Sequence, residues 1–258
     1  EFNSPGRLLH RALNKRQLCV HYQPIIDIKN KQCVGAEALL RWPGFNGQVM
    51  SPAEFIPLAE KEGMIERITD YVVEEVFNDL GHFLGNNPHL YISINLSASD
   101  FHSSRLIALI SDKAQHYSVR AQQIKIEVTE RGFIDVPKTT PVIQAFRQAG
   151  YEVAIDDFGT GYSNLHNLYS LNVDILKIDK SFTGAIGTDA VNSTVTDMII
   201  ALGQRLNIEL IAEGVETHAQ ASYLQRHGVH LLQGYLFSQP MPLEDFPRWM
   251  AEREALIV

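Results

Sequence analysis

Short runs of β-branched and other apolar residues alternate along the chain with longer segments whose apolar positions recur at helical spacing. Eight of the short runs have the length and the flanking residues of strands. They cover residues 19–28, 33–41, 91–96, 124–129, 152–157, 175–179, 208–213 and 231–237. Strands that alternate with helices in this way are typical of a parallel sheet covered by helices.

The segments between these strands carry signals for the start and end of helices. Ser51-Pro52-Ala53-Glu54 supplies an N-cap, a proline at the first helical position and a capping-box glutamate, and Gly63 marks an end. We expect further helices at about residues 68–80, 105–116, 139–150, 191–206, 218–227 and 243–252.

The first two strands are joined only by Lys29-Asn30-Lys31-Gln32, which is too short for a parallel crossover, so they should form an antiparallel hairpin. Eight strands interleaved with helices over 258 residues predict an α/β fold, a (β/α)8 barrel of the TIM type with an antiparallel first strand. A doubly wound open sheet is the competing architecture. No linker divides the chain, so we expect a single domain over residues 6–258. Residues 1–5 lack an initiator Met and resemble a cloning remnant.

Composition narrows the function classes. The chain has 30 acidic and 22 basic residues and a formal net charge of -8, which argues against polymeric nucleic acid as a partner. No apolar stretch approaches the ~18 residues of a membrane span. Cys19 and Cys33 have no metal-ligand spacing, which favours a reducing environment. We therefore expect a cytoplasmic segment without membrane contact, while the full-length protein is free to carry a sensory or membrane region elsewhere.

Acidic and amide residues recur at or just beyond the ends of the predicted strands. They are Glu37, Asn95, Glu127, Glu130, Asp156, Asp157, Asp179, Glu213 and Glu216. In a barrel these strand ends converge on one mouth, where carboxylates repel unless protons or cations intervene. Hard oxygen ligands suit Mg²⁺ or Mn²⁺. Any one of these acids alone is more often a solvated residue or an N-cap, but their repetition favours a metal site.

Two local features sharpen this hypothesis. Asp156 and Asp157 end an apolar strand, and adjacent carboxylates can bracket two divalent ions at the roughly 3.5–4 Å spacing of two-metal sites that favour displacement at phosphorus. The alternative is an Asx turn leading into the loop Gly159-Thr160-Gly161. Lys177 lies inside an apolar strand and needs anionic neighbours. It either orients or activates a water molecule or merely relieves acidic repulsion.

Glu37-Ala38-Leu39-Leu40-Arg41-Trp42 resembles the signature of the EAL domain, the cyclic-di-GMP-specific phosphodiesterases of bacteria. Further blocks fit the same family in the same order. They are Tyr22-Gln23-Pro24-Ile25, Phe55-Ile56-Pro57-Leu58-Ala59-Glu60, Ile94-Asn95-Leu96-Ser97, Glu127-Val128-Thr129-Glu130, residues 156–163, Leu176-Lys177-Ile178-Asp179, residues 212–217 and Gln233-Gly234-Tyr235. The resemblance covers about residues 6–250.

This resemblance implies a (β/α)8 barrel with its first strand antiparallel, in agreement with the short hairpin linker. It also implies hydrolysis of one phosphodiester of 3′,5′-cyclic di-GMP to linear 5′-pGpG with two Mg²⁺ or Mn²⁺ ions, inhibition by Ca²⁺, and a homodimer. It assigns the metal site to Glu37, Asn95, Glu127, Asp156, Asp157 and Glu213, with Asp156 shared between the ions. It assigns the catalytic role to Lys177, which positions the attacking water and assists its deprotonation, together with Glu37 and Glu213.

The same resemblance implies substrate contacts from Gln23, Leu40, Arg41 and Gln233. It implies loop and supporting roles for Glu130, Gly159, Gly161 and Glu216, with Glu130 anchoring the loop of residues 157–164. Two positions depart from the family pattern. Pro43-Gly44-Phe45-Asn46-Gly47 replaces the usual Trp-x-His-Pro continuation, and Asn164 stands where a second serine is common.

Two alternatives remain beside an active phosphodiesterase. One is a catalytically inactive EAL receptor that binds cyclic di-GMP and signals through partner contacts. Such receptors typically lack a metal ligand or the loop anchor, and here each of those positions is filled, so we expect an active enzyme. The other is a metal-dependent barrel enzyme that abstracts a proton from a carboxylate substrate with Lys177 as the base.

Overall fold

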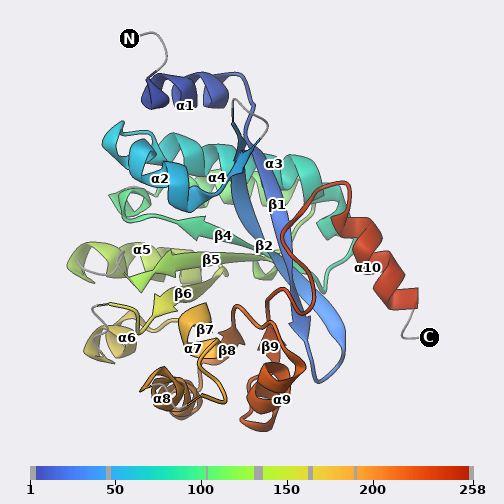
Figure 1. Ribbon diagram of the computed structural model, residues 1–258. Coiled ribbons are helices and arrows are strands. Elements are labelled where there is room, and N and C mark those ends of the chain that lie inside the picture. The colour runs from blue at the N-terminus through green and yellow to red at the C-terminus, as the bar shows by residue number, and fades with distance from the viewer. Residues whose placement is uncertain are drawn as a thin grey trace.

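The strands of the protein close into a barrel with helices on its outside (Figure 1). The structure is a computed structural model that describes residues 4–44, 48–102, 104–130, 136–161, 165–188 and 191–255. The barrel strands are β1 (Cys19–Asp27), β2 (Gln32–Pro43), β4 (Tyr91–Leu96), β5 (Ile124–Thr129), β6 (Glu152–Phe158), β7 (Ile175–Ile178), β8 (Glu209–Ala212) and β9 (Leu231–Leu232). The short strands β3 (Val49–Met50) and β10 (Met241–Pro242) pair with β2 and β1.

Strand β1 closes the barrel in an antiparallel sense. Each neighbouring pair of the barrel strands β2 and β4 to β9 is parallel, whereas β1 pairs antiparallel with both β2 and β9. The β1–β2 turn is stabilised by Asp27, which accepts hydrogen bonds from the backbone N–H groups of Lys29 and Asn30. The predicted barrel and its antiparallel start are therefore confirmed, and the closed sheet excludes the doubly wound alternative.

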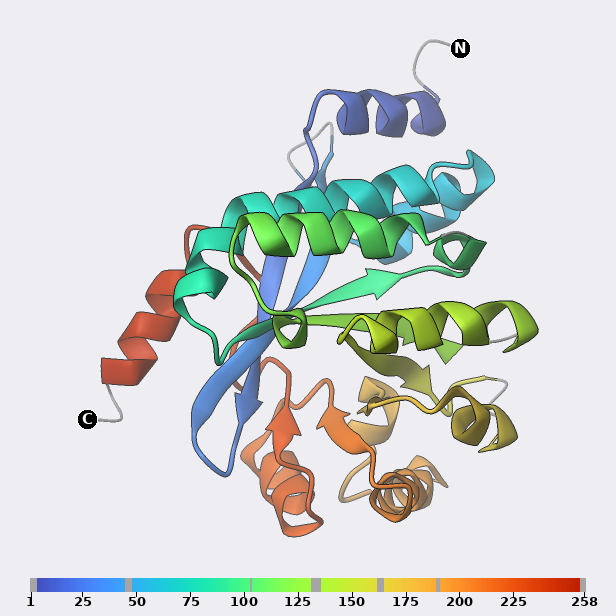
Figure 2. The same ribbon diagram turned by 180° about the vertical axis from the view of Figure 1, so that it is seen from behind.

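Helices cover the outer face of the barrel. They are α1 (Pro5–Asn14), α2 (Pro52–Lys61), α3 (Ile65–Asn86), α4 (Arg105–His116), α5 (Val136–Gln148), α6 (Leu165–Leu171), α7 (Lys180–Thr183), α8 (Val191–Arg205), α9 (His218–Arg226) and α10 (Phe246–Ala255). Figure 2 shows α3, α4 and α5 covering β4 and β5 from outside. The capping box of Ser51 and Glu54 forms as predicted.

Some predicted boundaries are wrong. The strand expected at 231–237 ends at Leu232, because the backbone N–H groups of Phe237 and Ser238 both turn back to the carbonyl of Gly234. The strand expected at 208–213 ends at Ala212. Helices α1, α6 and α7 were not predicted. Helix α1 begins at Pro5, and nothing in the structure tests whether residues 1–5 are a remnant.

The buried apolar side chains form two separate clusters, and polar residues occupy one end of the barrel interior. A large core lies between the strands and the helices, while a small cluster of Ile25, Tyr91, Ala154, Ile175 and Ile211 lies apart from it. Side chains alternate between the two faces of a strand, so Asp156, Lys177 and Glu213, each two positions after Ala154, Ile175 and Ile211, return to the same interior. The functional residues therefore lie above this small cluster, toward the carboxyl ends of the parallel strands.

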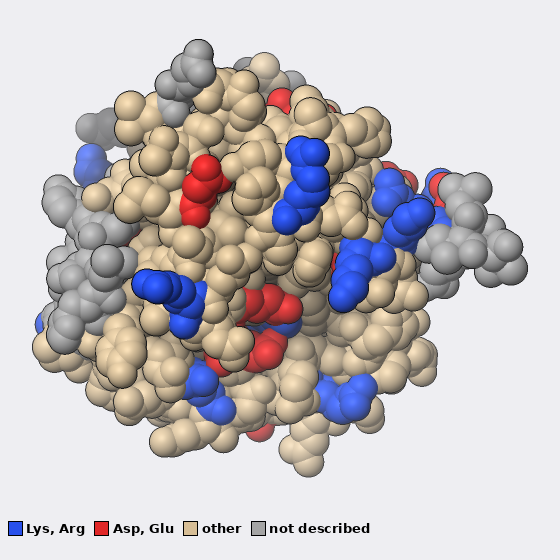
Figure 3. Space-filling view, turned by 90° about the horizontal axis from the view of Figure 1, so that it is seen from below, with Lys and Arg blue, Asp and Glu red and all other residues tan. Residues whose placement is uncertain are grey.

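The surface is mixed in charge. On the face in Figure 3, Lys and Arg side chains lie around a central hollow where acidic side chains gather. Of the described helices, none is both long enough and apolar enough to cross a membrane.

Candidate active site

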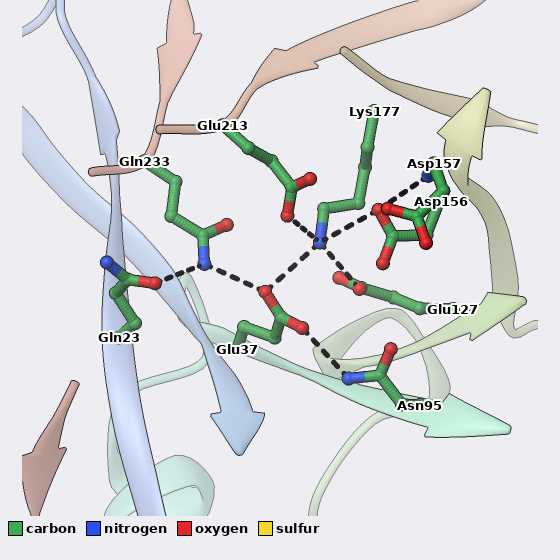
Figure 4. A network of polar contacts seen from close by, with 9 residues as sticks. All are labelled: Gln23, Glu37, Asn95, Glu127, Asp156, Asp157, Lys177, Glu213 and Gln233. Atoms are coloured by element: carbon green, nitrogen blue, oxygen red, sulfur yellow. Dashed lines mark hydrogen bonds and ion pairs between the residues drawn. The ribbon is translucent and has the colours of Figure 1, made fainter. Parts of the chain in front are cut away.

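Lys177 lies at the centre of a group of carboxylates inside the barrel mouth (Figure 4). Its Nζ lies 2.6 Å from Glu127 Oε2, 2.7 Å from Glu213 Oε1 and 3.1 Å from Glu37 Oε2. Asp156 Oδ1 is 3.9 Å away. Lys177 and Glu127 are fully buried. A lone buried ammonium would be costly, and these neighbours meet the need for anions that the sequence had indicated.

The Glu37 carboxylate is held from several sides. Asn95 Nδ2 donates to Glu37 Oε1 at 2.8 Å, and Gln233 Nε2 donates to Glu37 Oε2 at 2.8 Å. Lys177 donates to the same Oε2. Strand register explains the convergence, because Glu37, Asn95 and Lys177 sit on inward positions of β2, β4 and β7.

Two overlapping sets of carboxylates could each hold a divalent cation. Glu37, Glu127 and Asp156 bring one oxygen each within 4.8 Å of one another, and so do Asp156, Asp157 and Glu213. Asp156 belongs to both sets, as expected of a ligand shared by two ions. Glu127 Oε1 is buried without a hydrogen-bond partner among the described residues, which fits an oxygen available to a cation. The donor set therefore fits hard divalent metals.

The backbone at Asp157 holds the two aspartates together. Asp157 adopts a left-handed conformation with φ 57°, and its N–H donates to Asp156 Oδ1 at 2.8 Å. This conformation breaks the strand alternation, because consecutive residues of a regular strand point to opposite faces. Both carboxylates can therefore point into the same mouth of the barrel.

Burial and mutual repulsion change the protonation of these acids. Burial, followed by the negative charge of Glu37, raises the pKa of Glu127 to about 8. Burial, followed by the charge of Asp156, raises the pKa of Asp157 to about 6. Burial also raises the pKa of Glu213. Several carboxylates here therefore retain protons near neutral pH unless another cation replaces those protons.

Lys177 and Glu37 are the charged pair of the cluster. Burial opposes the Lys177 charge, but the surrounding carboxylates outweigh burial and raise its pKa well above the ordinary value. Burial likewise opposes ionisation of Glu37, but Lys177 and the amides of Asn95 and Gln233 outweigh it and lower the Glu37 pKa. Lys177 is therefore an ammonium that donates hydrogen bonds.

We expect the affinity of this site for Mg²⁺ to rise with pH between about 6 and about 8. Below these values protons occupy Asp157 and Glu127, whose pKa values are raised to about 6 and about 8, and a cation must displace them. Isothermal titration calorimetry in buffers of different ionisation enthalpy measures the protons released. Glu127→Gln should lose the part of the dependence near pH 8. An affinity independent of pH, without proton release, would contradict the raised values.

The residues predicted as substrate contacts fall into two groups. Arg41 lies at the mouth and is partly exposed, and its Nη1 donates to the carbonyl of Leu40 at 2.9 Å. The Leu40 side chain points to the opposite face of β2 and is buried in the outer core, so it lies outside the cluster. Gln23 and Gln233 are buried beside Glu37 and bond to each other, a contact that the sequence did not predict.

The residues predicted as loop supports are less closely tied to the cluster. Glu130 lines a hollow with Asp157 and Gly161, and both its carboxylate oxygens are buried without hydrogen bonds among the described residues. Gly159 has φ +90° and packs against Phe182. Residues 162–164 of this loop, and 45–47 of the departing segment after Trp42, lie outside the described residues.

Glu216 is exposed, and its backbone N–H donates to Gln220 Oε1 at the start of α9. The anchoring role of Glu130 and the supporting role of Glu216 both stay predictions.

The fold and the site define a (β/α)8 barrel protein whose mouth gathers the oxygen ligands of divalent cations around a buried lysine. The family model of the EAL domain matches residues 7–240. The chain belongs to the EAL domain family.

Two curated relatives from Escherichia coli K12 are similar along most of the chain. The probable cyclic di-GMP phosphodiesterase PdeB is 46% identical over 246 residues, and the probable cyclic di-GMP phosphodiesterase PdeD is 47% identical over 249 residues. Each match covers 95% of this chain but only 47% and 46% of the relative, so the chain spans about half the length of these proteins.

A solved structure gives the same picture of the fold. The PaMucR phosphodiesterase in a c-di-GMP complex superposes with a TM-score of 0.85 at 37% identity, and covers 93% of this chain and 99% of that one. The similarity therefore includes the whole barrel of a protein that binds cyclic di-GMP.

Proposed function

We propose that this chain hydrolyses one phosphodiester of 3′,5′-cyclic di-GMP to linear 5′-pGpG and thereby lowers the level of a second messenger. The observation that carries the proposal is the pair of carboxylate sets that share Asp156 around the Lys177 ammonium. The relatives named cyclic di-GMP phosphodiesterases support the substrate.

Each residue of the cluster has a defined part in this reaction. Glu37, Asn95, Glu127, Asp156, Asp157 and Glu213 would hold two Mg²⁺ or Mn²⁺ ions, which supply Lewis-acid polarisation of the phosphodiester when bound. Arg41, at the mouth, is placed to pair with a substrate phosphate through its guanidinium. Ca²⁺ should inhibit, because it favours more ligands at longer distances than Mg²⁺.

Lys177 positions the attacking water in this proposal. Its Nζ contacts Glu37, Glu127 and Glu213, so it is placed to hold the water by a hydrogen bond and to assist its deprotonation. Glu37 and Glu213, both in contact with Lys177, complete the catalytic set.

The alternative within the family is an inactive receptor for cyclic di-GMP. A test separates the two: the purified chain is incubated with cyclic di-GMP and Mg²⁺, and pGpG is measured by chromatography. We expect pGpG that disappears when the metal is chelated. Tight binding of cyclic di-GMP without pGpG would show a receptor instead.

The proposal also includes a homodimer and a cytoplasmic location. The loop of residues 157–164 begins at the metal ligand Asp157, so contact between two copies at this loop would act directly on the site. Light scattering of the purified chain tests the dimer.

A further inference from the structure

Gln23 and Gln233 form a chain of amide hydrogen bonds that ends on Glu37 (Figure 4). Gln233 Nε2 donates to Glu37 Oε2 at 2.8 Å and to Gln23 Oε1 at 2.9 Å. Gln23 Nε2 donates in turn to the backbone carbonyl of Ser238 at 3.2 Å. A fixed backbone group is thereby linked through two side chains to a carboxylate of the cluster.

The antiparallel register of β1 places Gln23 in this chain. Gln23 lies directly opposite Glu37 in the β1–β2 pair, and opposed residues of antiparallel strands project to the same face. Gln233 follows β9, which pairs with the other edge of β1. Gln23 and Gln233 are only 9% and 3% exposed, so water does not readily replace their hydrogen bonds.

These hydrogen bonds can run in only one direction. A glutamine amide carries two hydrogens on nitrogen and an oxygen that only accepts. The Ser238 carbonyl requires the nitrogen of Gln23, which turns the Gln23 oxygen toward Gln233. Gln233 must then present its nitrogen to both Gln23 and Glu37.

Apart from Glu37 itself, Gln23 is the only partner of the Gln233 amide among the described residues, because Gln233 Oε1 is buried without a partner. Without Gln23, the Gln233 amide keeps only its hydrogen bond to Glu37 and can turn away from that carboxylate, which then loses a fixed partner.

We propose that Gln23 is a positioning residue that fixes the Glu37 carboxylate toward the metal site by holding the Gln233 amide in one orientation. The proposal rests on the proposed function, in which Glu37 is a metal ligand. It differs from the substrate-contact role predicted for Gln23, because it requires no contact between Gln23 and the substrate.

The test measures Mg²⁺ binding alone, by calorimetry, in Gln23→Met, Gln233→Met and the double variant. Loss of an outer partner of a metal ligand typically weakens binding about 10–100-fold, so we expect at least about a 10-fold rise in the Mg²⁺ Kd of Gln23→Met. Because the two glutamines act in series, the double variant should bind Mg²⁺ no more weakly than Gln233→Met. At saturating Mg²⁺, the KM of Gln23→Met for cyclic di-GMP should return to the wild-type value.

Gln123 provides a matched control. It is a buried glutamine whose Nε2 donates to the backbone carbonyls of Leu84, Asn87 and Leu90, outside the site. Gln123→Met should lower thermal stability without changing the Mg²⁺ Kd. Gln23→Asn, which keeps an amide too short to reach Gln233, should behave like Gln23→Met and provides a second variant if the first folds poorly.

Three results would overturn the proposal: an unchanged Mg²⁺ Kd in both Gln23 variants, multiplying effects in the double variant, or a KM that stays raised at saturating Mg²⁺. The last result would indicate a direct substrate contact. Failure of the proposed function gives a different result, since the wild type would then bind Mg²⁺ without cleaving cyclic di-GMP.

Discussion

Glu37→Ala is expected to abolish the release of pGpG while the protein keeps its fold. Glu37 belongs to one of the two carboxylate sets and accepts hydrogen bonds from Asn95, Gln233 and Lys177. In the proposed metal site Glu37 is a direct ligand, so its removal should weaken Mg²⁺ binding by more than about 100-fold, the upper end of what loss of an outer partner costs. Stability without metal should fall, because the buried Lys177 ammonium loses the carboxylate whose pKa is lowered, but the fold should persist, since Lys177 keeps Glu127 and Glu213 as partners.

Three measurements on Glu37→Ala test this prediction. Chromatography follows pGpG, calorimetry follows Mg²⁺, and circular dichroism follows thermal unfolding. Glu252→Ala, which removes an exposed glutamate from α10, is the control and should match the wild type in all three. Normal turnover in Glu37→Ala would remove Glu37 from the metal site.

The fold could be predicted where a pattern of residue types is sufficient. Strand and helix periods predicted the barrel, and the four residues between the first strands required an antiparallel hairpin. The end of β9 could not be predicted, because the apolar run continues through Phe237. The strand ends earlier because hydrogen bonds to the Gly234 carbonyl turn the backbone. Position 234 also requires glycine, because a β-carbon there would lie only 2.2 Å from the Val215 carbonyl oxygen. Helix α1 depends on burial of Leu9 and Leu13, which the sequence pattern alone did not reveal.

The sequence predicted which residues belong to the candidate site better than it predicted the contacts between them. The acidic residues at strand ends and the family motifs identified the carboxylates and Lys177 as candidate site residues. The period of two along β2 places Arg41 on the face of Glu37 and Leu40 on the other, which argues against equal roles for the two. The bond between Gln23 and Gln233 depends on the pairing of β1 with both β2 and β9, and therefore on closure of the barrel.

Lys177→Met is expected to separate stability from chemistry. Without divalent ions, removal of a fully buried ammonium leaves buried carboxylates without their counter-charge, and the free energy of unfolding should fall by about 3–5 kcal/mol. Mg²⁺ should still bind and restore part of that stability, because its ligands remain. The release of pGpG at saturating Mg²⁺ should nevertheless be lost, since no other described ammonium lies in this cluster to position the water. Chemical denaturation with and without Mg²⁺, together with pGpG release, measures these effects.

Lys125→Met is the matched control for a buried lysine. Lys125 Nζ lies 2.8 Å from Glu152 and 3.7 Å from Glu209, over the ring of Tyr91 beyond the apolar cluster, and both these glutamates are partly open to solvent. Its removal should therefore cost less stability and leave turnover unchanged. If Lys177 only relieved acidic repulsion, Mg²⁺ would supply that charge and Lys177→Met would regain turnover at saturating metal. Lost turnover in Lys177→Met beside normal turnover in Lys125→Met would instead require a direct part for the Lys177 ammonium in the chemical step.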